Sequence, residues 1–158
     1  MQKIRIVSVG KMKEKYWLAA QAEYQKRLGR YASLEIVELK DEPTPENPTP
    51  REREAVLKKE AGRVAKAMEG FDAAAVMAIE GREFTSEGFA QALKPYVDGG
   101  KSICFVIGGS LGLAQEIKER GELFSLSRMT FPHRLARVVL LEQIYRAFKI
   151  LNNENYHK

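Results

Sequence analysis

The 158-residue chain has few of the residues that form disulfides and metal sites: one cysteine and two histidines. A single cysteine, Cys104, excludes an internal disulfide, and its apolar neighbours indicate a buried side chain in a reducing compartment. Two histidines 24 positions apart, His133 and His157, do not make a zinc site with that cysteine. No apolar run approaches the roughly 18 residues of a membrane span, and no signal-peptide pattern opens the chain. We therefore expect a cytoplasmic protein with no metal and no membrane partner.

The common nucleotide-binding fingerprints are also missing. The apolar run 103–107 ends at Gly108-Gly109, and Gly112 follows, but neither Gly-x-Gly-x-x-Gly nor the phosphate-loop Gly-Lys-Ser/Thr is present. Gly-x-Ser-x-Gly, the nucleophile elbow of serine hydrolases, is absent too. These absences disfavour a dinucleotide or triphosphate cofactor and a methyltransferase with an N-terminal Rossmann motif. The glycine turn still predicts a small-molecule site, because ligands bind at the carboxyl ends of strands and glycine permits close approach.

Hydrophobic periodicity predicts strands that alternate with helices over the whole chain. The expected strands are 3–9, 33–39, 73–79, 103–107 and 123–127, and the expected helices are 14–31, 51–68, 86–97, 114–120 and 133–151. Within 3–9, Ile4, Ile6 and Ser8 would share one face and Arg5, Val7 and Val9 the other. This order favours one α/β domain over residues 1–158, with a mostly parallel sheet flanked by helices. Residues 41–50 contain four prolines and predict a surface loop, and 152–158 form a polar tail.

Positive charge is concentrated at the two ends of the chain. The net charge is +5, with +6 over residues 1–31, +3 over 133–158 and −4 between them. If the ends meet in space, they form a positive face suited to nucleic-acid backbone. The alternative is an ordinary solvated surface on a mildly basic protein.

The predicted last helix, 133–151, is apolar around nearly its whole circumference. A sheet covers a terminal helix on one side only, so the pattern favours a second subunit against the other side. The alternative is that the helix crosses the core of a single chain.

Two further segments combine polar and apolar side chains in a way that suits a ligand. Residues 126–133 interleave hydroxyl and apolar residues, as in a loop around an adenine-like ring, although a plain strand-to-helix connection is the better explanation of this segment taken alone. The tail carries Tyr156 and His157, which can stack on and hydrogen-bond to an unpaired base, or can simply fray.

Several motifs together resemble one known family. The resemblance runs the full length and is carried by these segments: Val9-Gly10-Lys11, Lys15-Tyr16-Trp17, Glu23 to Leu28, Phe105 to Ser110, Leu126 to His133, Leu141 to Lys149 and Tyr156-His157-Lys158. In this combination the chain resembles the ribosomal large-subunit RNA methyltransferase H family, pseudouridine N3-methyltransferases of the SPOUT class.

The resemblance implies a homodimer, a C-terminal trefoil knot and methyl transfer from S-adenosylmethionine. The substrate it implies is N3 of a pseudouridine in helix 69 of 23S rRNA, on the assembled ribosome. The cofactor-binding residues that it implies are Met77, Gly108, Leu126, Ser127, Arg128, Met129, Thr130 and Phe131. The candidates for proton removal or anion stabilisation are His157, Tyr156, His133, Arg134 and Arg146, of which we favour His157 with Tyr156 as stacking partner.

Without the resemblance, two other functions fit the residues. A ribosome-binding assembly factor would share the charge pattern but would not bind S-adenosylmethionine. A flavodoxin-like small-molecule enzyme would have no salt-sensitive affinity for RNA.

Overall fold

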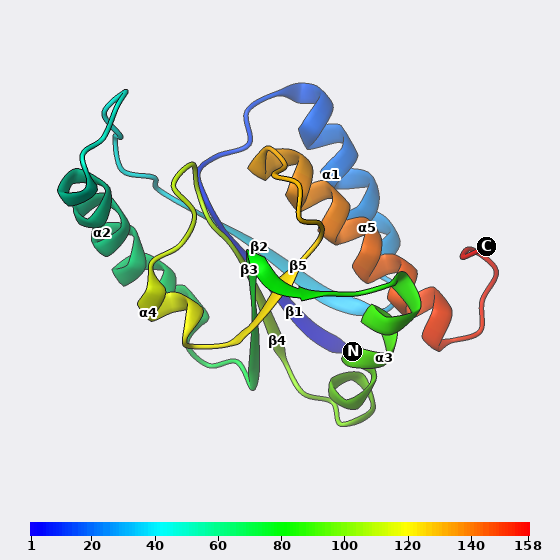
Figure 1. Cartoon of the computed structure of the whole chain (residues 1–158). Helices are drawn as coiled ribbons and strands as arrows, with labels where there is room; N and C mark the ends of the chain where they lie inside the picture. Colours follow the sequence, from blue (N-terminus) through cyan, green and yellow to red (C-terminus); the bar gives the residue numbers. More distant parts are fainter.

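The computed structural model describes all residues from Met1 to Lys158 as one sheet with five helices (Figure 1). Its elements are β1 (Gln2–Val9), α1 (Lys15–Leu28), β2 (Ala32–Leu39), α2 (Pro50–Met68), β3 (Ala73–Glu83), α3 (Ser86–Asp98), β4 (Ile103–Ile107), α4 (Gln115–Lys118), β5 (Glu122–Ser125) and α5 (His133–Leu151). The strand order is β2-β1-β4-β3-β5, and every neighbouring pair is parallel. The predicted fold class, a parallel sheet flanked by helices, is confirmed.

The sheet separates two apolar layers, and β1 shows why. Its side chains alternate, so Ile4 and Ile6 enter the larger core cluster while Val7 and Val9 enter the smaller one. Helices α1, α3 and α5 cover the first face and α2 and α4 the second (Figure 1). The two faces predicted from the sequence of β1 are therefore correct.

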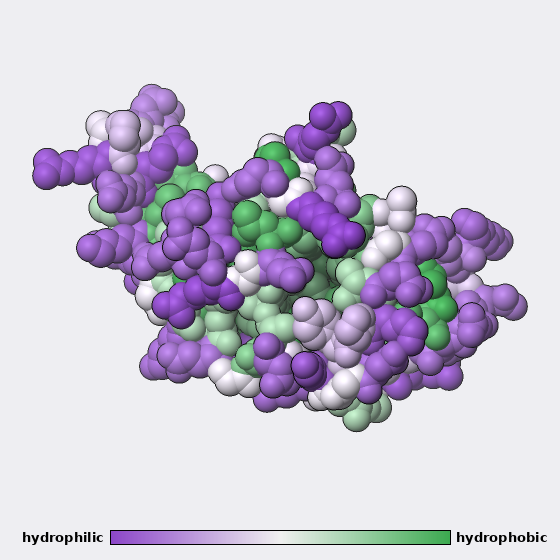
Figure 2. All heavy atoms as spheres, turned by 60° about the horizontal axis from the view of Figure 1, so that its bottom comes forward, coloured by the Kyte–Doolittle hydropathy of each residue, from purple (hydrophilic) through white to green (hydrophobic).

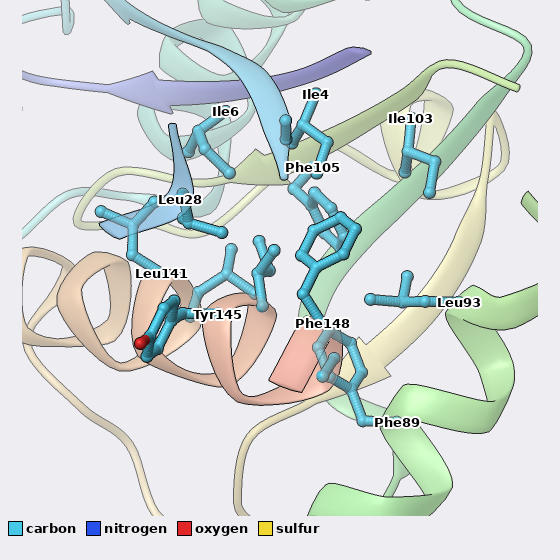
Figure 3. Close-up of a cluster of buried hydrophobic side chains, with 14 of the residues drawn as sticks. Ile4, Ile6, Leu28, Phe89, Leu93, Ile103, Phe105, Leu141, Tyr145 and Phe148 are labelled. Carbon is cyan, nitrogen blue, oxygen red and sulfur yellow. The ribbon is translucent and has the colours of Figure 1, made fainter. Parts of the chain in front are cut away.

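The larger core is centred on Phe105 of β4. This ring is fully buried and lies between strand residues such as Ile4 and helix residues such as Leu93 and Phe148 (Figure 3). Its ring centre lies 6.0 Å from that of Phe124, edge to face, a favourable aromatic arrangement. Burying β4 completely fixes where its glycine-rich end emerges.

Helix α5 is more enclosed than a sheet alone would make it. Besides the sheet, α1 and α3 both pack against it. Its buried face consists of Ala136, Arg137, Leu140, Leu141, Ile144, Tyr145, Ala147 and Phe148. On this face, the helix packs within the core of a single chain, which was the alternative to contact with a second subunit. Leu135, Val138 and Val139 on the outer face remain half-buried.

Some predicted boundaries and burial patterns are wrong. Helix α1 ends at Leu28 rather than residue 31, and Leu28 is its one buried side chain. The predicted helix at 114–120 has only four residues, and β5 ends at Ser125 rather than residue 127. Strand β3 extends to Glu83 through an irregularity between Met77 and Arg82. Of β3, expected to be buried on both faces, only Val76 and Ala78 are buried, because it lies beside the short edge strand β5.

Hydrophilic side chains cover most of the face shown in Figure 2, and hydrophobic ones gather in small patches. None of the helices is both long enough and apolar enough to cross a membrane.

Candidate active site

A cavity of about 270 Å³ opens beside the irregularity in β3, where β4 and β5 end. We call it the strand-end cavity. It is lined by residues 77–80 of β3, most of the loop after β4, the end of β5 with the segment that follows it (125–131, except Arg128) and the start of α5. Ten of its nineteen lining residues are hydrophobic. An apolar lining with a few polar groups is typical of small-molecule sites, although the volume lies just below the ~300 Å³ of usual pockets.

The glycine turn after β4 forms one wall of this cavity. Gly109 and Gly112 pair across the turn, and the Gly112 N–H donates to the Gly109 carbonyl at 3.1 Å. A Cβ on Gly108 would lie 2.6 Å from the Gly112 carbonyl oxygen, so the turn itself requires glycine there. At Gly108 the chain folds back on itself, so the turn alone is a reason for glycine there. Close approach of a ligand to the glycines, the explanation given from the sequence, stays a prediction.

Seven of the eight predicted cofactor-binding residues line the strand-end cavity. They are Met77, Gly108, Leu126, Ser127, Met129, Thr130 and Phe131. The eighth, Arg128, is in the same loop, but its side chain is 88% exposed and faces Glu83 at 3.8 Å. Hydroxyl groups hold the loop: the Ser125 hydroxyl donates to the Ser127 carbonyl at 2.7 Å, and the Met129 N–H donates to the Ser127 hydroxyl at 3.0 Å. The structure thus brings together segments about 20 to 50 residues apart in the chain at the strand ends.

His133 lies at the edge of the cavity as the first residue of α5. Its Nε2 atom lies 3.7 Å from the position that a Cβ on Gly10 would take, so it packs against the end of β1. Burial lowers the pKa of His133 below its ordinary value of 6.5, and the nearby Arg134 and Arg137 charges lower it further. The imidazole is therefore neutral at pH 7 and can accept a proton or a hydrogen bond.

The lowered pKa of His133 makes a testable prediction about stability. As pH falls below 6.5, the unfolded chain takes up a proton at this histidine before the folded chain does. The free energy of unfolding should therefore fall with pH from 6.5 down to the folded pKa. A His133→Gln variant should show a shallower slope than the wild type over this window in denaturant titrations. Equal slopes in the two proteins would contradict the buried, neutral histidine.

The C-terminal tail is docked against α5 and α3. Arg146 donates from Nη1 to Nδ1 of His157 at 3.1 Å, and His157 Nε2 lies 2.6 Å from a Glu87 carboxylate oxygen. Because arginine only donates, Nδ1 carries the lone pair and Nε2 the proton. The Tyr156 hydroxyl donates to Glu142 at 3.1 Å, and its ring packs edge to face on Tyr145 with 4.8 Å between centres. We call Glu87, Glu142, Arg146, Tyr156 and His157 the tail cluster. The hydrogen bonds of Tyr156 and His157 show that the tail is held against the helices and is not frayed.

Three of the five predicted candidates belong to the tail cluster, and the other two, His133 and Arg134, lie at the start of α5. His133 begins α5, whereas Arg146 comes 13 residues later, about 20 Å along the axis at 1.5 Å per residue. Figure 1 shows the C-terminus beyond the far end of α5. Within one chain, the tail cluster and the strand-end cavity are therefore separate.

A buried arginine behind the cavity was missed by sequence reasoning. Arg137 is fully buried, and Nη1 donates to Glu38 at 2.8 Å and to Gln21 at 2.9 Å, while Nη2 donates to the Ser8 hydroxyl at 2.9 Å. The bonds tie the start of α5 to β1, β2 and α1. An arginine among the apolar residues of helix 133–151 was the available signal. The same reasoning missed Glu142 and Glu87, which hold the tail.

Comparisons with known proteins place this fold in one class. "A probable methylase family protein" from Haemophilus influenzae Rd KW20 has a similar structure, with a TM-score of 0.57 and 16% sequence identity. The match covers 98% of this chain and 70% of that protein's chain. A "putative methylase family protein" from Neisseria gonorrhoeae covers 91% of this chain and 82% of its own, with a TM-score of 0.54 and 17% identity. These structures establish the shared fold. Residues 2–157 match the family described as "Predicted SPOUT methyltransferase", so the chain belongs to the SPOUT methyltransferases.

Within this class, the motifs named above indicated one family, and close relatives confirm it. Proteins named "Putative ribosomal RNA large subunit methyltransferase H" from Methanococcus vannielii and Methanococcus maripaludis are each 50% identical to this chain. Each match covers 157 residues, 98% of this chain and 99% of the relative. The chain is a member of the ribosomal RNA large-subunit methyltransferase H family.

Proposed function

We propose that this protein methylates large-subunit ribosomal RNA in the cytoplasm, with S-adenosylmethionine as donor. The observation that carries the proposal is the strand-end cavity, which gathers seven of the eight predicted donor-binding residues in a chain of this family. More specifically, we propose that the acceptor is N3 of a pseudouridine in helix 69 of 23S rRNA, within the assembled ribosome.

The strand-end cavity has side chains that fit such a donor. Met77, Leu126 and Phe131 offer apolar surface to an adenine ring, and Ser127 and Thr130 offer hydroxyl groups to a ribose. At the mouth, Lys118 and Glu80 form an ion pair of 2.6 Å, which places one group of each sign near a ligand with an amino-acid end. When bound, S-adenosylmethionine supplies an activated methyl group whose carbon–sulfur bond breaks as the new bond forms.

The work left to the chain's own residues is to align the acceptor and to remove its N3 proton. Alignment alone is a large effect, because it converts an encounter in solution into a reaction within one complex. N3 lies between two carbonyl groups, so a base can take its proton while a cation stabilises the resulting anion. We assign His157 as base or orienting group and Tyr156 as stacking partner, with Arg146 and Arg134 as the cations. His133, neutral at the cavity edge, is the other candidate base.

A homodimer would join the two separated parts of the site. Because the tail cluster is about 20 Å along α5 from the cavity, a tail must come from a second subunit unless it moves far within its own. We therefore propose that the tail of one subunit completes the strand-end cavity of the other. The half-buried apolar residues on the outer face of α5 offer a surface for this contact. Family membership further supports a C-terminal trefoil knot, formed around the cavity loops.

The proposed function is tested by methyl transfer from labelled S-adenosylmethionine. Intact ribosomes lacking the modification should be labelled, and reverse transcription and mass spectrometry should place the methyl group at N3 of a helix 69 pseudouridine. Binding of the donor without any labelling of RNA would contradict the proposed reaction. RNA binding without donor binding in calorimetry would favour the assembly factor instead.

Filling the strand-end cavity should block the donor. Thr130 is exposed, lines the cavity and has no side-chain hydrogen bond, so tryptophan there adds a large ring with little effect on folding. We expect Thr130→Trp to weaken S-adenosylmethionine binding at least ~10-fold, about 1.4 kcal/mol, in calorimetry. Arg128→Trp is the matched control: it lies in the same loop outside the cavity lining and should change affinity by less than about twofold. Equal losses in both variants would mean that the loop, not the cavity, matters.

A further inference from the structure

A second concave site adjoins the strand-end cavity and has the opposite chemistry. It encloses about 460 Å³ between the ends of β1, β2 and β4 and the start of α5, and only one of its eleven lining residues is hydrophobic. Lys11, Lys13, Lys40 and Arg134 contribute its positive charge. We call it the basic basin.

The three lysines of the basic basin are free to bind an anion. Lys11, Lys13 and Lys40 are exposed, and none of their ammonium groups has a carboxylate oxygen within 4.0 Å. Elsewhere at the two basic ends of the chain, Arg5, Arg27, Arg137, Arg146 and Lys149 all have partners. Lys11 and Lys13 from the N-terminal end thus meet Lys40, which follows β2, in one concave site. Other cations of the two ends that lack an ion pair, such as Lys26 and Lys158, lie outside it.

The two acids of the basic basin do not cancel this charge. Glu38 is already bound by the buried Arg137 at 2.8 Å and accepts the Met12 N–H at 2.8 Å, both at Oε2, so Arg137 already balances its negative charge. The remaining acid in the lining, Asp41, faces three lysines. Arg134 has its own partner, Glu14, at 3.2 Å. The basin therefore keeps an excess of positive charge that is open to solvent.

The basic basin is directly joined to the strand-end cavity. Gly109 and His133 line both, so an anion in the basin lies beside whatever occupies the cavity. Tyr16, 67% exposed, is the second residue of α1, so an exposed aromatic ring follows Lys11, Lys13 and Lys15 closely in the chain. Lysines with a nearby exposed ring are typical of surfaces that follow a single nucleic-acid strand.

We propose that the basic basin binds phosphate groups of the RNA strand that carries the target base. This inference rests on the proposed function, because it assigns one RNA contact of that same site. The phosphates next to the target nucleotide would lie against Lys11, Lys13 and Lys40. Their position fixes where the target base enters the strand-end cavity. Flexible lysines bind phosphates as point charges and carry no sequence preference, so the basin positions the strand and leaves base choice to the cavity.

The test compares two triple variants with the same change in charge. Lys11→Gln/Lys13→Gln/Lys40→Gln removes the basin's lysines. Lys59→Gln/Lys66→Gln/Lys101→Gln removes three other exposed lysines that also have no ion-pair partner. Affinity for a labelled single-stranded oligouridylate is measured over a range of KCl concentrations. Each phosphate contact adds about 0.7 to the salt slope for single strands, so the basin variant should have a slope shallower by about 2. It should also raise KM for ribosomes about tenfold while calorimetry shows unchanged donor affinity.

Equal salt slopes for the two triple variants would overturn the assignment. So would inorganic phosphate, if it bound the wild-type basin in NMR titrations as tightly as the oligouridylate, since the basin would then be a free-anion site. Failure of the proposed function is seen separately. If the wild type binds RNA through the basin but labels no ribosome, the reaction is wrong and the RNA contact stands.

Discussion

Replacing Arg137 by methionine is expected to lower the free energy of unfolding by about 3–5 kcal/mol, which is the usual cost of breaking a buried ion pair. The side chain is fully buried and donates to Glu38, Gln21 and Ser8. Without it, the buried Ser8 hydroxyl and the Glu38 carboxylate lose their partners. For a chain of this length we expect the melting temperature to fall by roughly 10 °C, which calorimetry or circular dichroism would detect.

Two controls separate the buried ion pair from general damage. Arg27→Ala breaks the surface pair with Glu23 at 2.8 Å and should leave the melting temperature almost unchanged. The double variant Arg137→Met/Glu38→Gln removes both charges and should recover part of the loss, because no unpaired charge remains beside the core. A single Arg137→Met variant as stable as the wild type would show that the pair does not hold the start of α5.

The same ion pair gives stability a pH dependence on the acid side. Desolvation alone would raise the pKa of Glu38, but hydrogen bonds from Arg137 and from the Met12 N–H outweigh it and lower the pKa below 4.5. The contribution of this carboxylate is therefore complete above pH 4.5 and is lost as pH falls through the lowered value. It adds at lower pH to the loss expected from His133.

Much of the fold could be predicted from the sequence because its signals are local. Alternation assigned Ile4 and Ile6 to one face of β1 and Val7 and Val9 to the other, and the structure confirms it. The bounds of β4 and α5 were predicted to the residue, since each is marked by an abrupt change in composition. The burial of β3 was not predicted, because it depends on the length of its neighbour β5 and not on its own apolar residues.

The candidate site was harder to predict from the sequence than the fold, because it depends on contacts between distant segments. The sequence singled out the glycine turn and residues 126–131, but their meeting with residues 77–80 required the strand order of the folded sheet. The buried position of Arg137 could not be predicted, because it is one charged residue in an otherwise apolar helix and its partners are distant in the sequence. Glu38 and Ser8 lie about 100 and 129 residues away. The separation of His157 from His133 could not be predicted either, since it depends on the tail docking at the far end of α5.

Removing the last four residues is expected to reduce methyl transfer to ribosomes by about 10²–10⁴-fold, the usual contribution of a positioned acid or base. Deletion of 155–158 takes away Tyr156 and His157, which are not in the lining of the strand-end cavity. Donor binding in calorimetry should therefore be retained within about twofold. Wild-type turnover by the shortened protein would rule out a catalytic role for the tail, and lost donor binding would point to a structural one.

Mixing two impaired proteins, at a donor concentration too low to saturate Thr130→Trp, would then show which subunit each tail serves. One is the tail deletion, which keeps an open cavity, and the other is Thr130→Trp, which keeps its tail but has a filled cavity. If a tail completes the cavity of its partner, a mixed dimer contains one complete site: the open cavity of the first subunit with the tail of the second. Equal mixing makes half of the dimers mixed, so about a quarter of the wild-type rate should return. If each tail served its own cavity, no dimer would contain a complete site and no activity would return. We expect the first outcome, the return of activity, because within one chain α5 holds the tail and the cavity about 20 Å apart.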